Sequence, residues 1–421
     1  MELKVRRIIN NQLIESIFLG VSQILLWGSS YFMIPILGSF IVKETGWSSH
    51  FIYGCFSISI LISGLISPKV GKKINQLNHN YILLSSGIVM ALGLFILSFS
   101  YHKITFILGW LVVGLGMGFG LYDALFASLG KKYGKNASVS IVQITLISGF
   151  ATTIIWPLMA FINEEIGWRL TLIFFAFLLI IITLPIHYFS FIKYKKTEVS
   201  LSKIKNTDFK TANKKREVVP NLKLVFYLLL INFSIGSFLM TGIYIYILDI
   251  LKDKGIGVKE AVAIGALLGP SQVGVRILDM CFPKKTPLIT AIISSLGILI
   301  SFILLLFSIR IAFLAVIIFG LGNGMRSILR GTLPLWIFKP KIYATVIGSL
   351  AFLPLVFQAV TPLVGGFIIN YFNTKVFVYM LCALAALNLL PLIFLQQVLN
   401  GRKLMKINNN LLGLIKNIFQ S

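Results

Sequence analysis

The sequence has little charge and few of the side chains that carry enzyme chemistry. Only 12% of its 421 residues are charged, and 13 acidic residues stand against 38 lysines and arginines. Soluble globular domains hold roughly 25% charged residues, so a soluble globule is excluded. The four histidines and three cysteines show no metal-ligand spacing, and neither a Ser-His-Asp set nor a Walker phosphate loop occurs. We therefore expect no enzyme, no metal and no cofactor.

The sequence is instead rich in long apolar segments. Hydrophobic residues make up 57% of the chain, and its mean hydropathy is +0.91. An apolar segment of about 20 residues is long enough to cross a bilayer. Such segments run over 16–42, 50–67, 80–99, 104–129, 138–162, 168–191, 224–250, 259–282, 286–308, 311–337, 343–371 and 376–399. The sequence therefore predicts an all-α integral membrane protein with twelve transmembrane helices in two bundles of six.

A polar, strongly basic stretch separates the two predicted bundles. We expect an N-terminal six-helix half at 1–191, a cytoplasmic basic linker at 192–222 and a C-terminal six-helix half at 223–400. The linker is low in aromatic residues, which is typical of a flexible connection. The last segment, 401–421, is expected to be a weakly amphipathic cytoplasmic tail.

The excess of positive charge follows the predicted topology. A net charge of +25 would suggest a nucleic-acid partner in a soluble protein. Here, with the N-terminus inside, the cytoplasmic segments collect 28 of the 38 lysines and arginines. This is the positive-inside bias of membrane proteins, and it predicts that both termini are cytoplasmic. We expect contact with membrane lipid, through anionic headgroups, and no nucleic-acid partner.

Two pairs of short motifs indicate that the halves are duplicated. "GLGMG" at 114–118 returns as "GLGNG" at 320–324, and "PKVGKKI" at 68–74 returns as "SQVGVRI" at 271–277. Glycines four residues apart let helices approach closely. Two halves with the same orientation imply a pseudo-two-fold axis along the membrane normal, with a central site near the bilayer midplane.

The stretch "GLISPKVGKK", Gly64 to Lys73, resembles the signature of the loop between spans two and three in the major facilitator superfamily. The matching residues are Gly64, Lys69, Gly71, Lys72 and Lys73. Pro68 stands where the family usually has Asp, and Trp110 stands near the place of the span-four Arg of many proton-coupled members. "GLYDALFA" and "RGTLPLWIF" further resemble bacterial members. The resemblance implies a secondary transporter, a symporter or antiporter, that acts as a monomer in the bacterial cytoplasmic (inner) membrane.

Arginines at membrane depth are the strongest candidates for solute binding. Asn323, Arg326 and Arg330 share one face of a helix at about 100° per residue. Ionisable residues at this depth are costly and face a cavity or a partner. Two forked guanidiniums favour an anionic or strongly polar solute. The alternative for Arg330 is that it extends to the inner surface or pairs with a structural acid there.

Acidic residues at the inner ends of spans are candidates for coupling or gating. In members of the family, an acid at the position of Asp123 can pair with the basic residue of the loop signature, which is Lys72 here; a solute or proton role is the alternative. Arg276 and Asp279 are three residues apart and able to pair. Because Arg276 aligns with Lys73, we expect it at the inner boundary.

Polar side chains at mid-depth complete the predicted site. Gln272 lies one turn deeper than Arg276 and is a candidate to bind the solute. In the family the first span of each half lines the cavity; the alternative is ordinary helix packing. The candidates in those two spans are Trp27, Ser30, Tyr31, Thr241 and Tyr244.

The function expected from these residues is secondary active transport. Two rocking halves would move a small, polar, anionic organic solute, with Asp123 or Asp279 able to couple it to protons. One alternative is an exporter of larger amphipathic or siderophore-like solutes. Another is a non-transporting membrane receptor or scaffold that signals through the linker or the tail.

Overall fold

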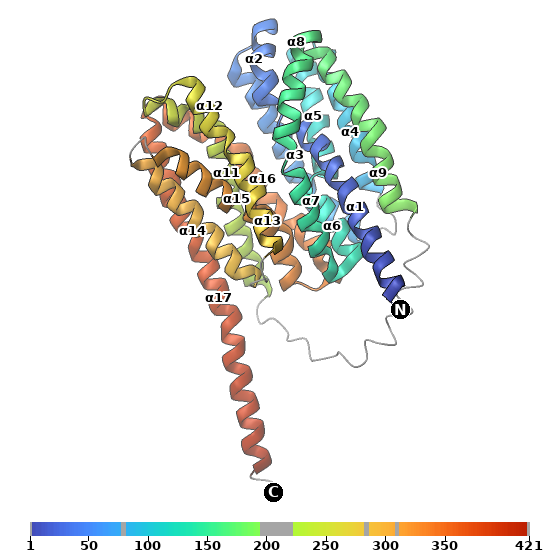
Figure 1. Ribbon diagram of the computed structural model, residues 1–421, viewed down its shortest axis with the longest axis vertical. Helices are drawn as coiled ribbons and strands as arrows, with labels where there is room; N and C mark the ends of the chain where they lie inside the picture. Colours follow the sequence, from blue (N-terminus) through green and yellow to red (C-terminus); the bar gives the residue numbers. More distant parts are fainter. Residues whose placement is uncertain (1, 77–80, 194–221, 282–285, 308–310, 419–421) are drawn as a thin grey trace.

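The structure is a computed structural model that describes residues 2–76, 81–193, 222–281, 286–307 and 311–418 (Figure 1). Within these ranges every regular element is a helix, and no strand occurs. The all-α prediction is therefore confirmed. The predicted linker lies almost entirely outside the described residues, so its boundaries stay predictions.

The first half contains the helices before the linker. They are α1 (Glu2–Gly28), α2 (Ile34–Thr45), α3 (Ser49–Gln76), α4 (Tyr81–Ser98), α5 (Lys103–Gly120), α6 (Tyr122–Tyr133), η1 (Gly134–Asn136), α7 (Ala137–Ser148), α8 (Ala151–Leu178), η2 (Leu179–Thr183), α9 (Leu184–Tyr188) and η3 (Phe189–Lys193). The backbone of α8 is not helical at Gly167, where φ is 75°. One crossing ends there and the next begins.

The second half contains the helices after the linker. They are α11 (Leu222–Asp253), α12 (Val258–Ala266), α13 (Leu268–Cys281), α14 (Pro287–Leu306), α15 (Ala312–Ile337), α16 (Pro340–Tyr371) and α17 (Thr374–Ile418). Helix α1 begins and α17 ends at the lower end of Figure 1. We call this end the terminal side and the opposite end the far side.

By length and composition alone, eight helical segments of the described chain can cross a membrane. One of them, Lys103–Ile192, runs through several helices. Other crossings are broken helices: α1 with α2, and α12 with α13. When each broken pair is taken as one crossing and α8 is divided at Gly167, the described helices make twelve crossings, six in each half.

Several crossings that the sequence predicts as unbroken are interrupted. The breaks lie between α1 and α2, at Leu121, at Gly149 with Phe150, and at Leu267. At the first break, Pro35 occupies the first turn of α2, where its missing N–H costs nothing. Irregular backbone is tolerated at membrane depth only where protein or a cavity surrounds it. Ser29 and Ser30 at this break are fully buried, so the break points into the protein.

The repeated glycines pack helices together in both halves, as predicted. A Cβ on Gly114 would lie 2.5 Å from the carbonyl oxygen of Ser59 in α3. In the second half, a Cβ on Gly324 would lie 2.7 Å from the carbonyl oxygen of Gln272 in α13. Only glycine allows such an approach.

The second pair of motifs, at 68–74 and 271–277, does not occupy equivalent places in the two halves. Gly118 faces the carbonyl of Ser63, whereas its counterpart Gly324 faces that of Gln272. Ser63 thus corresponds to Gln272. One turn further on, Arg276 corresponds to Ser67 and not to Lys73. The prediction that Arg276 lies at the inner boundary is therefore wrong: it is 3% exposed and lies deeper.

The prediction of a loop around Pro68 is also wrong, because α3 continues as a helix to Gln76. Its last turns pack against α16 of the other half. A Cβ on Gly71 would lie 2.9 Å from the Cα of Gly348, and a Cβ on Gly64 would lie 3.0 Å from the Cβ of Leu355. Close packing between the halves stabilises the helical conformation past the proline.

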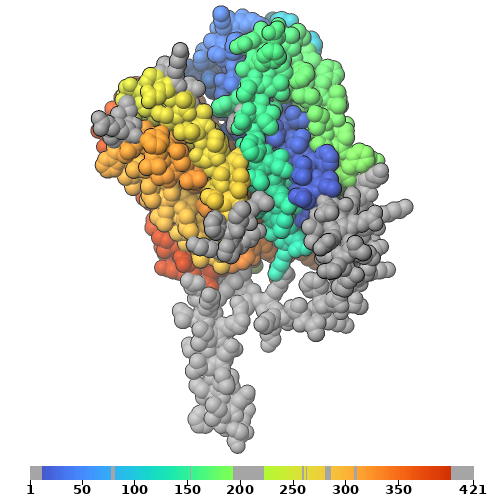
Figure 2. Space-filling model, in the orientation of Figure 1, coloured from blue at the N-terminus to red at the C-terminus, as the bar shows by residue number. Residues whose placement is uncertain are grey.

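The two halves are joined along α3 and α16. Toward the far side, Phe51 and Cys55 of α3 line one pocket with Ala359 and Leu363 of α16, and further contacts run from mid-depth to the terminal side. Tyr343, Ala344 and Ile347 of α16 share an apolar cluster with first-half residues such as Leu125 and Leu129. Among the described residues, no hydrogen bond or ion pair joins the halves on the far side of Tyr31. Figure 1 shows α2 and α8 apart from α12 at that end, whereas Figure 2 shows the halves in contact lower down.

Candidate functional site

A polar layer lies between the halves at mid-depth, and Tyr31 is its first member. The break after α1 places this side chain at the interface. Its hydroxyl lies 3.3 Å from Oγ1 of Thr241 and accepts a hydrogen bond of 3.1 Å from Nε2 of Gln358. Both partners belong to the second half and are buried. Tyr31 and Thr241, which the sequence predicts as separate lining residues, are therefore brought together.

Arg276 is the cation of this layer. Its Nη1 donates to the carbonyl of Thr145 in α7 of the other half at 2.5 Å. Its Nη2 donates to Oγ of Ser327 at 2.8 Å, and its Nε lies 3.5 Å from the carbonyl of Gly324. These α15 residues are at the middle of that helix. All three acceptors are uncharged, so a buried guanidinium bridges the halves through neutral groups.

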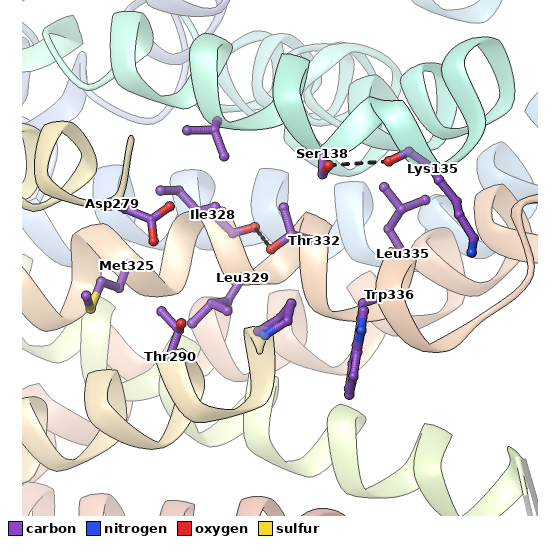
Figure 3. Close-up of a pocket in the computed structure, with 12 residues that line it drawn as sticks. Lys135, Ser138, Asp279, Thr290, Met325, Ile328, Leu329, Thr332, Leu335 and Trp336 are labelled. Carbon is purple, nitrogen blue, oxygen red and sulfur yellow. Dashed lines mark hydrogen bonds between the residues drawn. The ribbon is translucent and has the colours of Figure 1, made fainter. Parts of the chain in front are cut away.

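The break in the fifth crossing makes room for this guanidinium. A Cβ on Gly149 would overlap Nη1 of Arg276, so a larger residue would exclude it. The predicted pairing of Arg276 with Asp279 does not form: no ion pair joins them among the described residues. The carboxylate of Asp279 instead points into a separate cavity (Figure 3).

Two tyrosines flank Arg276, one from each half. Tyr122 and Tyr244 both lie near its guanidinium. The Tyr122 hydroxyl lies 2.5 Å from Oγ of Ser148. Tyr244 is hydrogen-bonded to Gln272 and Asn323. The predicted residues Gln272, Asn323 and Tyr244 therefore form one group beside the cation.

An aromatic wall in the first half adjoins these groups. The ring of Trp27 lies 5.5 Å from that of Tyr31 and 5.1 Å from that of Tyr122. Its Nε1 is buried and has no acceptor among the described residues. Ser30, in contrast, follows the end of α1 and donates to the carbonyl of Leu26 in that helix at 2.6 Å. Trp27 thus presents a donor at the layer, while Ser30 is engaged locally.

Asp123 and Arg330 join the halves nearer the terminal side. Nη2 of Arg330 donates to Oδ2 of Asp123 at 2.7 Å, across 207 positions of sequence. Their side chains are only 15% and 18% exposed, respectively. Lys72, the partner predicted for Asp123, is exposed. Of the two alternatives for Arg330, the structure shows pairing with an acid.

Arg326 lies within the second half and faces α11. Its Nη2 donates to the carbonyl of Phe233 at 2.9 Å and lies 3.5 Å from Oγ of Ser237. A Cβ on Gly236 would overlap its Cζ. The absence of a side chain at Gly236 therefore leaves space on α11 for this guanidinium. The predicted face of α15 therefore divides: Asn323 and Arg326 turn to α11, whereas Arg330 turns to α6. Solute binding by Arg326 stays a prediction.

Sequence reasoning missed several members of the layer. Two of them could have been found from the sequence. Gln358 is an amide in an apolar segment, and Tyr122 is the neighbour of Asp123. Thr145 contributes a backbone carbonyl and Gly149 contributes space, and neither leaves a mark in one sequence. Among the described residues, no group of three or more His, Cys, Asp or Glu side chains is placed to hold a metal ion.

Solved structures with similar folds are transporters. The human organic anion transporter MFSD10 (TETRAN) aligns with a TM-score of 0.68 and 13% identity, over 91% of this chain and 99% of that one. The proton:xylose symporter XylE, bound to 6-bromo-6-deoxy-D-glucose, aligns with a TM-score of 0.63 and 13% identity, over 92% and 94%. At these identities the likeness shows the fold alone.

No curated protein matches the sequence. The model of the Major Facilitator Superfamily matches residues 19–353, which is well over half of the chain. The match agrees with the two six-helix halves, the membrane-spanning helices and the polar layer between the halves. The chain is therefore an integral membrane protein that belongs to the Major Facilitator Superfamily.

Proposed function

We propose that this protein is a secondary transporter for a small, polar organic anion, which binds at Arg276 between the two halves. The observation that carries the proposal is a buried guanidinium bonded only to neutral groups at mid-depth. Arginine cannot be discharged in a protein, and its forked donors suit a carboxylate or a phosphate. A buried charge without a counter-ion is costly, so an anionic solute would relieve that cost.

The surroundings of Arg276 supply the remaining recognition. Tyr122 and Tyr244 offer hydroxyl groups from both halves, and Gln272 offers an amide. Trp27 offers an indole N–H without an acceptor among the described residues. Ligand sites combine an apolar wall with a few convergent polar groups in this way. The organic anion transporter among the similar structures supports an anionic solute.

The contacts between the halves support alternating access. The described arrangement has its terminal side closed by Asp123 with Arg330 and by the packing of Gly71 on Gly348. We propose that solute enters from the far side and competes with the Thr145 carbonyl for Nη1 of Arg276. Rocking of the halves would then separate Asp123 from Arg330 and open the terminal side. Gly64 and Gly71 act in this scheme as packing surfaces of the gate.

Proton coupling belongs to the same proposal. Asp123 is held by Arg330, whereas Asp279 faces a cavity and has no ion-pair partner among the described residues. Asp279 is therefore the better candidate to carry a proton. The similarity to a proton:xylose symporter supports coupling of this kind. We further propose a monomer in a bacterial cytoplasmic membrane, with both termini in the cytoplasm, as the positive-inside bias indicates.

Thermal unfolding of the purified protein with a panel of solutes tests the proposal. Solutes that bind the folded state raise its unfolding temperature in a concentration-dependent way. We expect carboxylates or phosphate esters to raise it and organic cations and neutral sugars not to do so. The same measurement on Arg276→Gln should show no response to the anions. Stabilisation of the wild type by cations or sugars alone would reject an anionic solute.

A further inference from the structure

The cavity that Asp279 faces lies between the halves, nearer the terminal side than the polar layer. It holds about 390 Å³ and runs between α7 of the first half and α13, α14 and α15 of the second (Figure 3). Its walls are mainly apolar, and the residues that form them include Val142, Met325, Ile328, Leu329 and Leu335. None of these residues belongs to the polar layer around Arg276, so the cavity is separate from the proposed solute site.

The end of this cavity nearest the terminal side is basic. Lys135 of η1 lines it and is exposed. Trp336, which is 48% exposed, lines the same end of the cavity from the end of α15. A Cβ on Gly134 would lie 3.9 Å from Cβ of Pro340, so exposed Lys339 and Lys341 belong to the same edge. Tryptophan and lysine are the residues that meet lipid headgroups at the membrane surface.

The opposite end of the cavity is acidic. Figure 3 shows Asp279 beside Met325 and Ile328, several turns of α15 away from Trp336 and Lys135. A negatively charged group in the cavity is attracted to the lysine end and repelled from the aspartate end. The two ends therefore give an occupant with one anionic head a single orientation.

We propose that this cavity binds a membrane phospholipid with an anionic headgroup. Its phosphate lies at Lys135 and an acyl chain follows the apolar wall formed by Val142, Leu329 and Leu335. A free anion would gain nothing from that wall, and a lipid without net charge would gain less from the lysines than an anionic lipid does. Because α7 belongs to one half and α15 to the other, the lipid binds the arrangement in which these helices lie as described. Bound lipid thus favours the conformation closed on the terminal side.

Retention of added lipid by the full-length protein tests this site without any transported solute. The purified protein in detergent is incubated with phosphatidylglycerol or phosphatidylcholine, and bound lipid is measured by native mass spectrometry. We expect Lys135→Gln to bind about five-fold less phosphatidylglycerol, since one lysine near a headgroup contributes about 1 kcal/mol. We expect Thr332→Phe, which fills the cavity, to reduce the binding of both lipids.

Lys103→Gln is the matched control, because Lys103 is exposed at the far side and should leave lipid binding unchanged. Unfolding temperatures without lipid, equal among the variants, show that each one folds. Equal phosphatidylglycerol binding by wild type and Lys135→Gln would overturn the proposal. Inorganic phosphate that raises the unfolding temperature as much as phosphatidylglycerol does would also overturn it. So would displacement of the lipid by a solute that the protein transports. Failure of the anion test at Arg276 leaves this measurement unaffected.

Discussion

The two halves share a glycine frame, and the residues after that frame differ between them. After Gly114 to Gly118 the helix breaks at Leu121, and α6 begins with Tyr122 and Asp123. After Gly320 to Gly324, α15 continues unbroken to Ile337 and carries Arg330. The glycine frames are 206 positions apart (320 minus 114), and the ion pair of Asp123 with Arg330 spans 207. The two charges therefore occupy nearly equivalent places in the repeat.

Near-equivalent residues that touch must lie close to the pseudo-two-fold axis. An unchanged duplication would place two like charges opposite each other there, and like charges at a buried interface repel strongly. An acid in one half and a base in the other turn this repulsion into an ion pair. Packing can therefore be inherited by both halves, whereas groups at the axis have to diverge.

The largest expected effect comes from breaking the pair at the axis. Asp123→Asn leaves the guanidinium of Arg330 partly buried without a counter-ion, which costs about 3–5 kcal/mol. We expect a clear fall in the unfolding temperature of the purified protein. The double exchange Asp123→Arg with Arg330→Asp restores opposite charges and should recover much of the loss. Lys72→Gln is the control, because exposed Lys72 should not matter. A double exchange as unstable as the single variant would contradict this role of the pair.

The next effect concerns a position at which the halves are not alike. Arg276 has Ser67 as its counterpart, whose hydroxyl donates to the carbonyl of Ser63 in its own helix, at 2.7 Å. We expect Arg276→Gln to weaken anion binding at least about 30-fold, which corresponds to about 2 kcal/mol for a buried charge pair. Uptake into proteoliposomes over a range of solute concentrations measures it.

Two further variants accompany that measurement. Arg276→Lys keeps the charge without the fork and should fall between wild type and Arg276→Gln. Ser67→Ala should transport as the wild type does. If Arg276→Gln and Ser67→Ala transport equally well, the solute does not bind at Arg276.

The shared glycine frame predicts a smaller and more equal effect. A Cβ on Gly114 would lie 2.5 Å from the Ser59 carbonyl, and one on Gly320 would lie 2.6 Å from Cβ of Ser271. Gly114→Ala and Gly320→Ala should each cost about 1–3 kcal/mol through overpacking. Thermal unfolding measures both. Gly274→Ala meets no atom within 4 Å and should be neutral or slightly stabilising; a loss there comparable to the other two would show that crowding is not the cause.

The smallest expected effect on solute binding distinguishes the roles of Asp123 and Asp279. Asp279→Asn should abolish the stimulation of uptake by an inward proton gradient while leaving exchange of solute across the membrane intact. Asp279 lines the other cavity and makes no ion pair with Arg276 among the described residues, so solute binding should change little. The measurement is uptake with and without a pH difference, and the comparison is wild type. A pH response that persists in Asp279→Asn would assign coupling to another group.

Much of the fold was predictable because the bilayer imposes simple constraints. Twelve apolar segments were sufficient to predict the number of crossings, and the glycine frames were sufficient to predict two duplicated halves. The breaks were harder to predict, since apolar length does not show where a helix stops within the membrane. Pro35 was the visible signal for one of them. The break at Leu121 has no comparable marker, and it is this break that sets the direction of Tyr122.

The candidate site was predictable in its residue types and less so in its partners. Tyr31, Thr241, Tyr244 and Gln272 were all predicted, and the structure brings them into one layer. Arg276 was assigned to the wrong depth because its motif resembles the one that contains Lys73. Sequence likeness between two helices does not fix their register, which depends on the residues they pack against.

The sequence by itself determined that this is a duplicated, all-helical membrane protein, because apolar length, charge distribution and glycine spacing act locally along the chain. Only the tertiary structure decided which charges meet. Asp123 pairs with Arg330 and not with Lys72, and Arg276 donates to the Thr145 carbonyl and does not pair with Asp279. The reason is that an ion pair or a hydrogen bond needs a separation of about 3 Å between atoms, and that separation is set by how two halves dock across hundreds of residues of chain.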